Sequence, residues 1–214
     1  MAFNDMVSKA QTYFPNLKIA YKDQSTFMKV LGKILFFNTG FMNDFVTTLG
    51  NTIYYPNEAY TQTQAGIDVT IHECTHLYDQ KRFNFLYTLA YALPQLLFLP
   101  SLLLFLISWK LAIPVALFFL LPIPAPWRTY FEKRAYSVQL YVYKQVWGSS
   151  LAELYTAADD LNKFFTNSTY YFMWPFGEDG SLRSVAANVS VGNDPIDDPA
   201  LMTIVDALVL AAKV

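Results

Sequence analysis

The chain contains little histidine and cysteine, and it has no excess of positive charge. Of its 214 residues, two are histidines and one is a cysteine, Cys74. A single cysteine excludes a disulfide within the chain, and Cys74 is expected to pack in the core rather than to bind a metal. Lysine and arginine number 15 against 17 aspartates and glutamates, which gives a formal net charge of -2. Because no basic run or basic surplus is present, no nucleic-acid partner is expected.

Charged side chains are especially scarce in one part of the chain. They make up 15% of the sequence, against about 25% in typical globular domains. The deficit is local, because Lys110 is the only charged residue between Phe83 and Trp127. As a single helix, Phe85–Ser108 would be about 36 Å long, which is enough to cross a bilayer core of about 30 Å. Pro94 and Pro100 break this first arm, and the return segment, Leu111–Ala125, is shorter and is also interrupted by prolines.

Residues 85–126 are therefore predicted to form an inserted apolar helical hairpin, and two environments are open for it. The hairpin could dip into or barely cross a membrane, or its kinked helices could be buried in protein, in the core or against partner chains. Basic residues flank both ends of the stretch: Lys81, Arg82, Arg128, Lys133 and Arg134. In a membrane, this positive charge would place any metal site on the cytoplasmic side. The first residues show no signal-peptide pattern.

The two histidines lie four residues apart around a glutamate, in the HExxH pattern His72-Glu73-Cys74-Thr75-His76. A helix is predicted from about Gly66 to Arg82, and it would place both imidazoles on one face, where they could bind one zinc ion. Glu73 lies one step round the helix, where it could hold the attacking water without binding the ion. The alternative is that two half-buried histidines share a helix face by chance.

A zinc site of this kind needs a third protein ligand, and the chain has no third histidine. Asp79 follows the motif closely, but along a straight helix it lies about 10 Å above His72. It is expected in a second shell or in solvent. Glu132 is the better candidate, because it lies on a second predicted helix from about Trp127 to Trp147. Ala135 is small enough to let the two helices approach. Alternatively, Glu132 is a solvated glutamate among basic neighbours.

The order of these elements resembles that of the membrane gluzincins, which include the CaaX-prenyl-protein endopeptidases and the bacterial heat-shock membrane proteases. In that family HExxH is followed by transmembrane helices and then by Glu-x-x-Ala-Asp. Here Glu132 and Ala135 match the second motif, and Tyr136 stands where the family has aspartate. The resemblance covers about residues 45–145. It implies that the strand at Thr47–Tyr55 is similar to the edge strand on which gluzincins bind a substrate peptide.

The function predicted from these residues is that of a membrane-associated zinc endopeptidase, with His72, His76 and Glu132 as metal ligands and a peptide or protein as substrate. Glu73 would take a proton from water and pass it to the leaving amine. Tyr136 or Arg128 could stabilise the oxyanion, or either could serve only in packing or a salt bridge. Two alternatives remain open. The chain could be a structural component of a large assembly, such as a viral particle, or a zinc-binding toxin or immunity-type protein.

The predicted fold class is α+β, mainly α, as a single zincin-like domain over residues 1–214 with a small edge strand or hairpin. One short and one longer helix are expected within residues 4–37, and a strand or hairpin at Thr47–Tyr55, ended by Pro56. Ser150 and Glu153 form a capping box that opens a helix to about Phe165. Residues 167–198 are expected to be loop-rich. A final helix is expected over Leu201–Val214.

Overall fold

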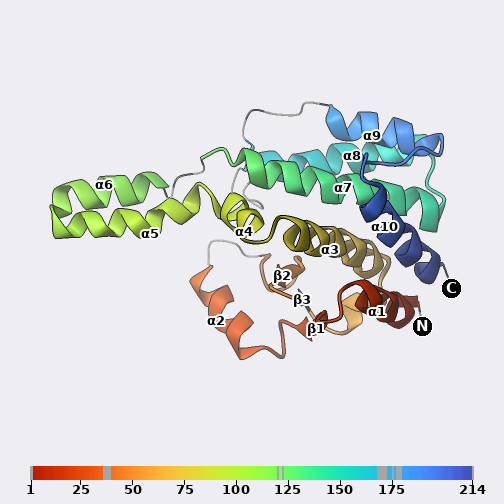
Figure 1. Ribbon diagram of the computed structural model, residues 1–214, viewed down its shortest axis with the longest axis horizontal. Helices are drawn as coiled ribbons and strands as arrows, with labels where there is room; N and C mark the ends of the chain where they lie inside the picture. Colours follow the sequence, from red (N-terminus) through yellow and green to blue (C-terminus); the bar gives the residue numbers. More distant parts are fainter. Residues whose placement is uncertain are drawn as a thin grey trace.

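The protein is mainly helical and carries one small sheet, in the computed structural model shown in Figure 1. The structure describes residues 2–35, 40–119, 121, 123–167, 173–174, 176 and 180–213. Within these residues it has ten α-helices, three short 3-10 helices and a three-stranded mixed sheet. The predicted mainly α character with a small sheet is confirmed.

The sheet lies beside the amino-terminal helices and has the strand order β1-β3-β2. Strand β1 (Lys18–Tyr21) pairs in parallel with β3 (Thr52–Tyr55), and β2 (Thr47–Leu49) pairs antiparallel with β3. The hairpin predicted at residues 47–55 is therefore confirmed, with Gly50 in its turn at a φ of 58°. Strand β2 has β3 as its only partner strand among the described residues, so it forms one edge of the sheet.

The prediction for residues 4–37 was incomplete. Two helices are present, α1 (Ala2–Tyr13) and α2 (Thr26–Ile34), but β1 lies between them, and the second helix is the shorter one. A four-residue strand has too few residues to show a period. It exists here because it pairs with β3, about thirty residues further along the chain, which a local pattern cannot indicate.

Helix α3 (Gln64–Phe83) carries the HExxH motif through the centre of the body (Figure 1). It follows the 3-10 helix η1 (Ala59–Gln62), and the Thr63 side chain caps it by accepting a hydrogen bond of 3.0 Å from the backbone N–H of Gly66. The helix predicted from about Gly66 to Arg82 is confirmed. Twelve of its residues are buried, because α1, β3, α7 and α10 surround it with one hydrophobic core.

Helix α7 (Pro126–Trp147) packs along α3 and carries Glu132. Proline at its first position suits a helix start, and Gly148 ends it with a φ of 72°. Buried side chains of α7 also contribute to a second core with α8 (Leu151–Thr166) and α9 (Ser181–Ser190). The predicted Ser150–Glu153 capping box is present with both of its hydrogen bonds.

The carboxyl-terminal part was predicted in outline only. Helix α10 (Pro199–Ala212) corresponds to the expected final helix and packs against α1. Helix α9 lies in the segment that was expected to be loop-rich, so that expectation is wrong for residues 181–190. Its apolar residues Leu182, Ala186 and Val189 do have helical spacing and are buried, but polar residues and glycines around them obscured the pattern.

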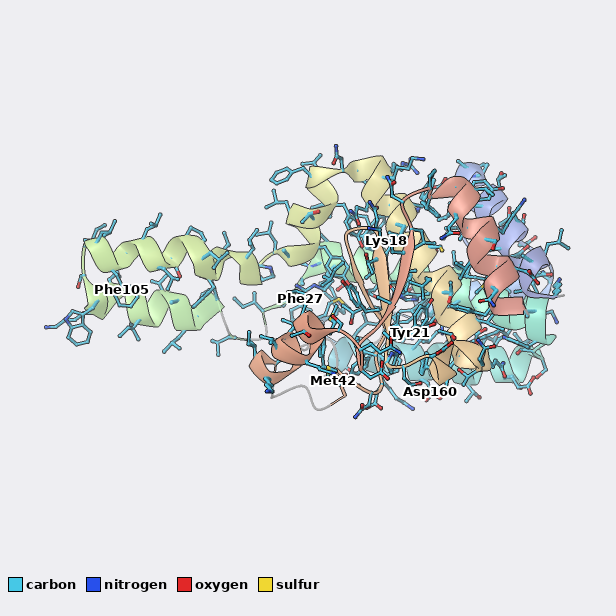
Figure 2. The ribbon with its side chains drawn as sticks, turned by 90° about the horizontal axis from the view of Figure 1, so that it is seen from below. Lys18, Tyr21, Phe27, Met42, Phe105 and Asp160 are labelled. Carbon is cyan, nitrogen blue, oxygen red and sulfur yellow. The ribbon has the colours of Figure 1, made fainter. Side chains whose placement is uncertain are left out.

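The apolar stretch forms a hairpin that projects away from the body (Figures 1 and 2). It begins with α4 (Phe85–Ala92), which lies against α7. One arm then continues through η2 (Gln95–Leu97), α5 (Phe98–Ser101) and η3 (Leu102–Leu106), and α6 (Trp109–Phe119) returns. Phe105 marks the far end in Figure 2.

Phe85–Ser108 is not one continuous helix, as expected from the prolines in this arm. Leu93 is extended, with a ψ of 147°, because the proline that follows it disfavours helical backbone at the preceding residue. In the part of the chain that the structure describes, no helix has both the length and the apolar character needed to cross a membrane. The hairpin nevertheless exposes many large apolar side chains, including Leu103, Leu106 and Ile107.

Candidate metal centre

The three predicted metal ligands lie together in the interior. His72 and His76 project from the same face of α3, and Glu132 reaches them from α7. Their side chains are almost completely buried, with 3%, 6% and 1% of their surface exposed. Each offers one ligand atom, and these three atoms lie within 4.8 Å of one another. Among the described residues, no other group of three histidine, cysteine or carboxylate side chains is arranged in this way.

The distances within this group fit a single zinc ion. Ligand atoms that surround zinc tetrahedrally at about 2.0–2.1 Å are about 3.3 Å apart. The two Nε2 atoms of His72 and His76 are 3.2 Å apart. Oε2 of Glu132 lies 3.5 Å from Nε2 of His72, and Oε1 lies 3.5 Å from Nε2 of His76.

The charge of the group also suits a cation. Burial would raise the pKa of Glu132, but His76 and His72 outweigh this effect and hold the pKa well below its usual range, so the carboxylate is ionised. Burial lowers the pKa of His76, but the Glu132 carboxylate beside it raises the pKa to about 9. Oε2 of Glu132 has no hydrogen-bond partner among the described residues. A buried carboxylate oxygen normally has a hydrogen-bond donor, so this oxygen is open to an ion held between it and the histidines.

Two tyrosines from α4 complete the wall of the site, and the sequence reasoning missed both. The Tyr91 hydroxyl donates a hydrogen bond to Oε1 of Glu132. The Tyr87 ring lies 6.4 Å from the His76 ring and 5.5 Å from the Tyr91 ring. A signal was present, because the two tyrosines lie four residues apart within an otherwise apolar stretch. That spacing gives one helix face a pair of hydroxyls.

Two cavities meet at the metal centre, and both are lined by His72 and Glu73. The smaller, of about 610 Å³, is lined also by His76, Glu132 and residues 46–50, which include β2. The larger, of about 890 Å³, lies towards α8. Glu73 is 8% exposed and lines both cavities, as His72 does. This is the place that a general base beside the ligands would occupy.

The two candidates for oxyanion stabilisation differ in position. Tyr136 packs against His72, with ring centroids 4.8 Å apart, and it lines the larger cavity. Arg128 instead contacts Tyr91, because its Nε donates a hydrogen bond of 2.8 Å to the Tyr91 carbonyl and its guanidinium lies 5.4 Å from the ring. It lines neither cavity, so Tyr136 is the better placed of the two.

Asp79 is not one of the ligands, as expected, but it is not in solvent. It is fully buried, and Arg134 of α7 binds both of its carboxylate oxygens at 3.0 and 3.1 Å. Arg134 also binds Asp198 at 3.0 Å, and Asp198 caps α10. These ion pairs connect α3, α7 and α10. The expected packing of Cys74 in the core is confirmed, and burial raises the pKa of its thiol to about 12.

Comparison with known proteins does not assign this chain to a family, because no family model, curated protein or solved structure matches it. The geometry therefore carries the functional argument. It shows a buried group of two histidines and one glutamate that could hold a metal ion, in a mainly helical fold.

Proposed function

We propose that this protein is a zinc-dependent endopeptidase with a gluzincin-like site. The observation that carries the proposal is the position of Glu132, which reaches the two histidines of the HExxH motif from a separate helix. Two imidazoles and one carboxylate form a common ligand set of catalytic zinc. The order of motif helix, apolar hairpin and Glu132-x-x-Ala135 supports a relationship to the membrane gluzincins.

The residues around the ligands have the properties that peptide hydrolysis requires. When bound, zinc polarises a carbonyl group and makes water a stronger nucleophile. Glu73 accepts the proton of the attacking water and delivers it to the leaving amine, because its carboxylate borders the cavities beside both histidines. Tyr136, packed on His72, is the candidate donor to the developing oxyanion.

Strand β2 offers a surface on which an extended peptide could bind. It is an edge strand of the sheet, and its residues line the same cavity as the three ligands. A substrate that pairs with β2 would gain backbone hydrogen bonds independent of its sequence. Its scissile bond would then lie near His72, His76 and Glu73.

The test of this function is the substitution Glu73→Gln. The variant is expected to bind one zinc ion per chain, as the unchanged protein does, and to lose peptide hydrolysis, because glutamine cannot accept the proton. Metal content by mass spectrometry and cleavage of a mixed peptide library measure the two properties. Glu58→Gln, at an exposed position of the same chain, is the matched control and should keep both. Full hydrolysis by the Glu73 variant would refute the proposal.

We also propose that the projecting hairpin attaches the enzyme to a membrane. Helix α6 has 11 residues and is about 16 Å long, close to half of a bilayer core of about 30 Å. Its exposed side chains are almost all apolar, and Lys110 is its only charged residue. Lys81 and Arg128 lie next to the base of the hairpin, where anionic headgroups of the cytoplasmic leaflet would meet them.

Flotation with vesicles tests this attachment. The protein is expected to float with vesicles that contain anionic lipid, and Leu103→Asp with Leu106→Asp should abolish flotation, because charge in the bilayer interior is costly. Leu151→Asp with Leu210→Asp, at exposed positions of the body, is the matched control. If the unchanged protein ignores vesicles but is isolated in fixed stoichiometry with other chains, the hairpin is instead a contact within an assembly.

A further inference from the structure

The larger cavity beside the metal centre is lined by several carboxylates. Its walls come from α3, α7, α8 and residues 44–46. Five carboxylate side chains line it: Asp44, Asp68, Glu73, Glu153 and Asp160. No lysine or arginine is among the described residues that form its walls. A space of about 890 Å³ with this lining favours a positively charged group.

The five carboxylate side chains differ in how deeply they are buried. Asp44, Glu153 and Asp160 are exposed and border the cavity from the outside. Two of them already have partners, since Asp160 binds Lys163 at 2.7 Å and Glu153 caps α8. Asp68, in contrast, is only 3% exposed.

Asp68 is the deep carboxylate that a ligand would meet away from the metal centre. Its Oδ1 accepts a hydrogen bond of 2.6 Å from Nε1 of Trp147, a neutral group that leaves its charge uncompensated. Burial, opposed in part by this bond, raises the Asp68 pKa to about 7. A cation that entered the cavity would provide the missing opposite charge.

A second buried polar side chain lies in the wall of the same space. Gln139 of α7 is 7% exposed and lines the cavity. Its Nε2 donates a hydrogen bond of 2.7 Å to the Tyr143 hydroxyl, and its Oε1 has no partner among the described residues. A buried amide oxygen is normally hydrogen-bonded, so this one could still accept a hydrogen bond from a donor that a ligand brings into the wall.

Aromatic rings supply the remaining walls. Tyr60, Tyr143 and Phe164 line the cavity together with the acids. The faces of such rings attract ammonium and guanidinium groups, and their apolar surface packs against the methylene stem of a long side chain. Carboxylates, a polar amide and aromatic rings together match the side chains of lysine and arginine.

We propose that this cavity binds a lysine or arginine side chain of the peptide substrate, with Asp68 as its counter-ion. The proposal rests on the proposed peptidase function and makes it specific: cleavage occurs next to a basic residue. The cavity reaches His72 and Glu73, so a side chain held there belongs to a residue adjacent to the scissile bond. Asp68 acts by binding and not by proton transfer.

Cleavage of matched peptides is the first test. Peptides that differ only in arginine, lysine, citrulline or norleucine at one position are compared by kcat/KM. We expect arginine and lysine to be preferred over citrulline by at least about 30-fold, and Asp68→Asn to remove this preference. Asparagine keeps the size and the acceptor that Trp147 uses. The citrulline peptide should be cleaved equally by both proteins. Equal cleavage of the arginine and citrulline peptides by the unchanged protein would overturn the proposal.

Calorimetric binding separates this proposal from the proposed function. The arginine peptide is expected to bind the zinc-loaded protein at least about 30-fold more tightly than the citrulline peptide. Such a preference without any hydrolysis would refute the peptidase and retain the cationic site. Hydrolysis without this binding preference would retain the peptidase and refute the cationic site. If Asp68→Asn does not fold, Asp44→Asn with Asp160→Asn, both exposed, should weaken binding of the arginine peptide about 3-fold and leave that of the citrulline peptide unchanged.

Discussion

The hydroxyl of Tyr91 donates a hydrogen bond to Glu132, the carboxylate that meets both histidines. The bond reaches Oε1, the oxygen that lies 3.5 Å from Nε2 of His76. It comes from α4, the first helix of the apolar stretch, so the base of the projecting hairpin orients a carboxylate that could hold a metal ion. Partners of this kind fix the ligand in its binding geometry.

Tyr91→Phe should therefore weaken zinc binding by about 10-fold, because it removes the hydroxyl and keeps the ring. Competition with a chromophoric chelator measures the affinity. Tyr87→Phe is the matched control, since Tyr87 lies one turn away in the same wall and lines the same cavity. Equal affinities of the unchanged protein and the Tyr91 variant would show that the hydrogen bond does not orient Glu132.

The ion pair between Arg134 and Asp79 predicts a large effect on stability. Arg134→Met should lower the free energy of unfolding at pH 7 by about 3–5 kcal/mol, because it leaves a buried charge without its partner. The double variant Asp79→Asn with Arg134→Met should lose less than the single variant. Urea denaturation followed by circular dichroism measures both. An Arg134 variant as stable as the unchanged protein would mean that the pair contributes nothing.

The loss of stability caused by Arg134→Met should also depend on pH. Burial raises the pKa of Asp79 in the folded protein, although Arg134 lowers it. Without Arg134 the folded-state pKa should rise further above the unfolded value of about 3.9. The folded state then binds the proton more tightly than the unfolded chain, so the variant should regain stability as the pH falls from 7 to 5. The loss relative to the unchanged protein should be smaller at pH 5 than at pH 7.

At Gly66, we expect alanine to change the free energy of unfolding in the direction opposite to the one that helix propensity predicts. Alanine in place of glycine inside a helix usually stabilises it by about 1 kcal/mol. A Cβ at Gly66, however, would lie 2.3 Å from the Tyr60 carbonyl oxygen, a backbone atom that cannot move aside easily. Gly66→Ala should therefore lower the free energy of unfolding by about 1–3 kcal/mol. Gly32→Ala is the control, because its Cβ would meet the flexible Met42 side chain. Thermal unfolding of both variants shows whether each substitution raises or lowers the stability of the protein.

The burial of Lys22 predicts that its contribution to the free energy of unfolding increases in mild alkali. Its amine is fully buried and donates hydrogen bonds of 2.5 and 2.8 Å to the carbonyl oxygens of Phe41 and Phe45. Burial lowers its pKa from 10.5 to about 8. Between these values the unfolded chain binds more protons than the folded protein, so the contribution of Lys22 to stability increases with pH. The free energy of unfolding of the unchanged protein minus that of Lys22→Met should rise from pH 8 to pH 10.

The sequence was sufficient to predict that His72, His76 and Glu132 form a group that could hold a metal ion. The spacing of His72 and His76 places them on one helix face, and the capping box and Gly148 mark the ends of helices without tertiary information. Glu132 could be chosen because no third histidine exists and because Ala135 permits a close helix contact. Its distance from the imidazoles confirms that these two helices meet at the metal centre.

The parts that failed depend on contacts between distant segments. Strand β1 exists through its pairing with β3, and Tyr91 reaches Glu132 across 41 positions of the chain. For the apolar stretch, a broken helical hairpin was expected, and Pro94 with the extended Leu93 before it does divide the first arm. Only the course of the backbone shows that this hairpin projects from the body.

Arg134, Asp79 and Asp198 hold α3, α7 and α10 together on their own, by bonds in which no metal takes part. The two helices that carry His72, His76 and Glu132 are therefore joined by contacts that do not depend on an ion. If the group binds zinc as proposed, a chelator is expected to remove the ion while the chain stays folded, and added zinc is expected to restore binding without unfolding. A preparation that is inactive because it lacks the ion should then regain activity when zinc is added.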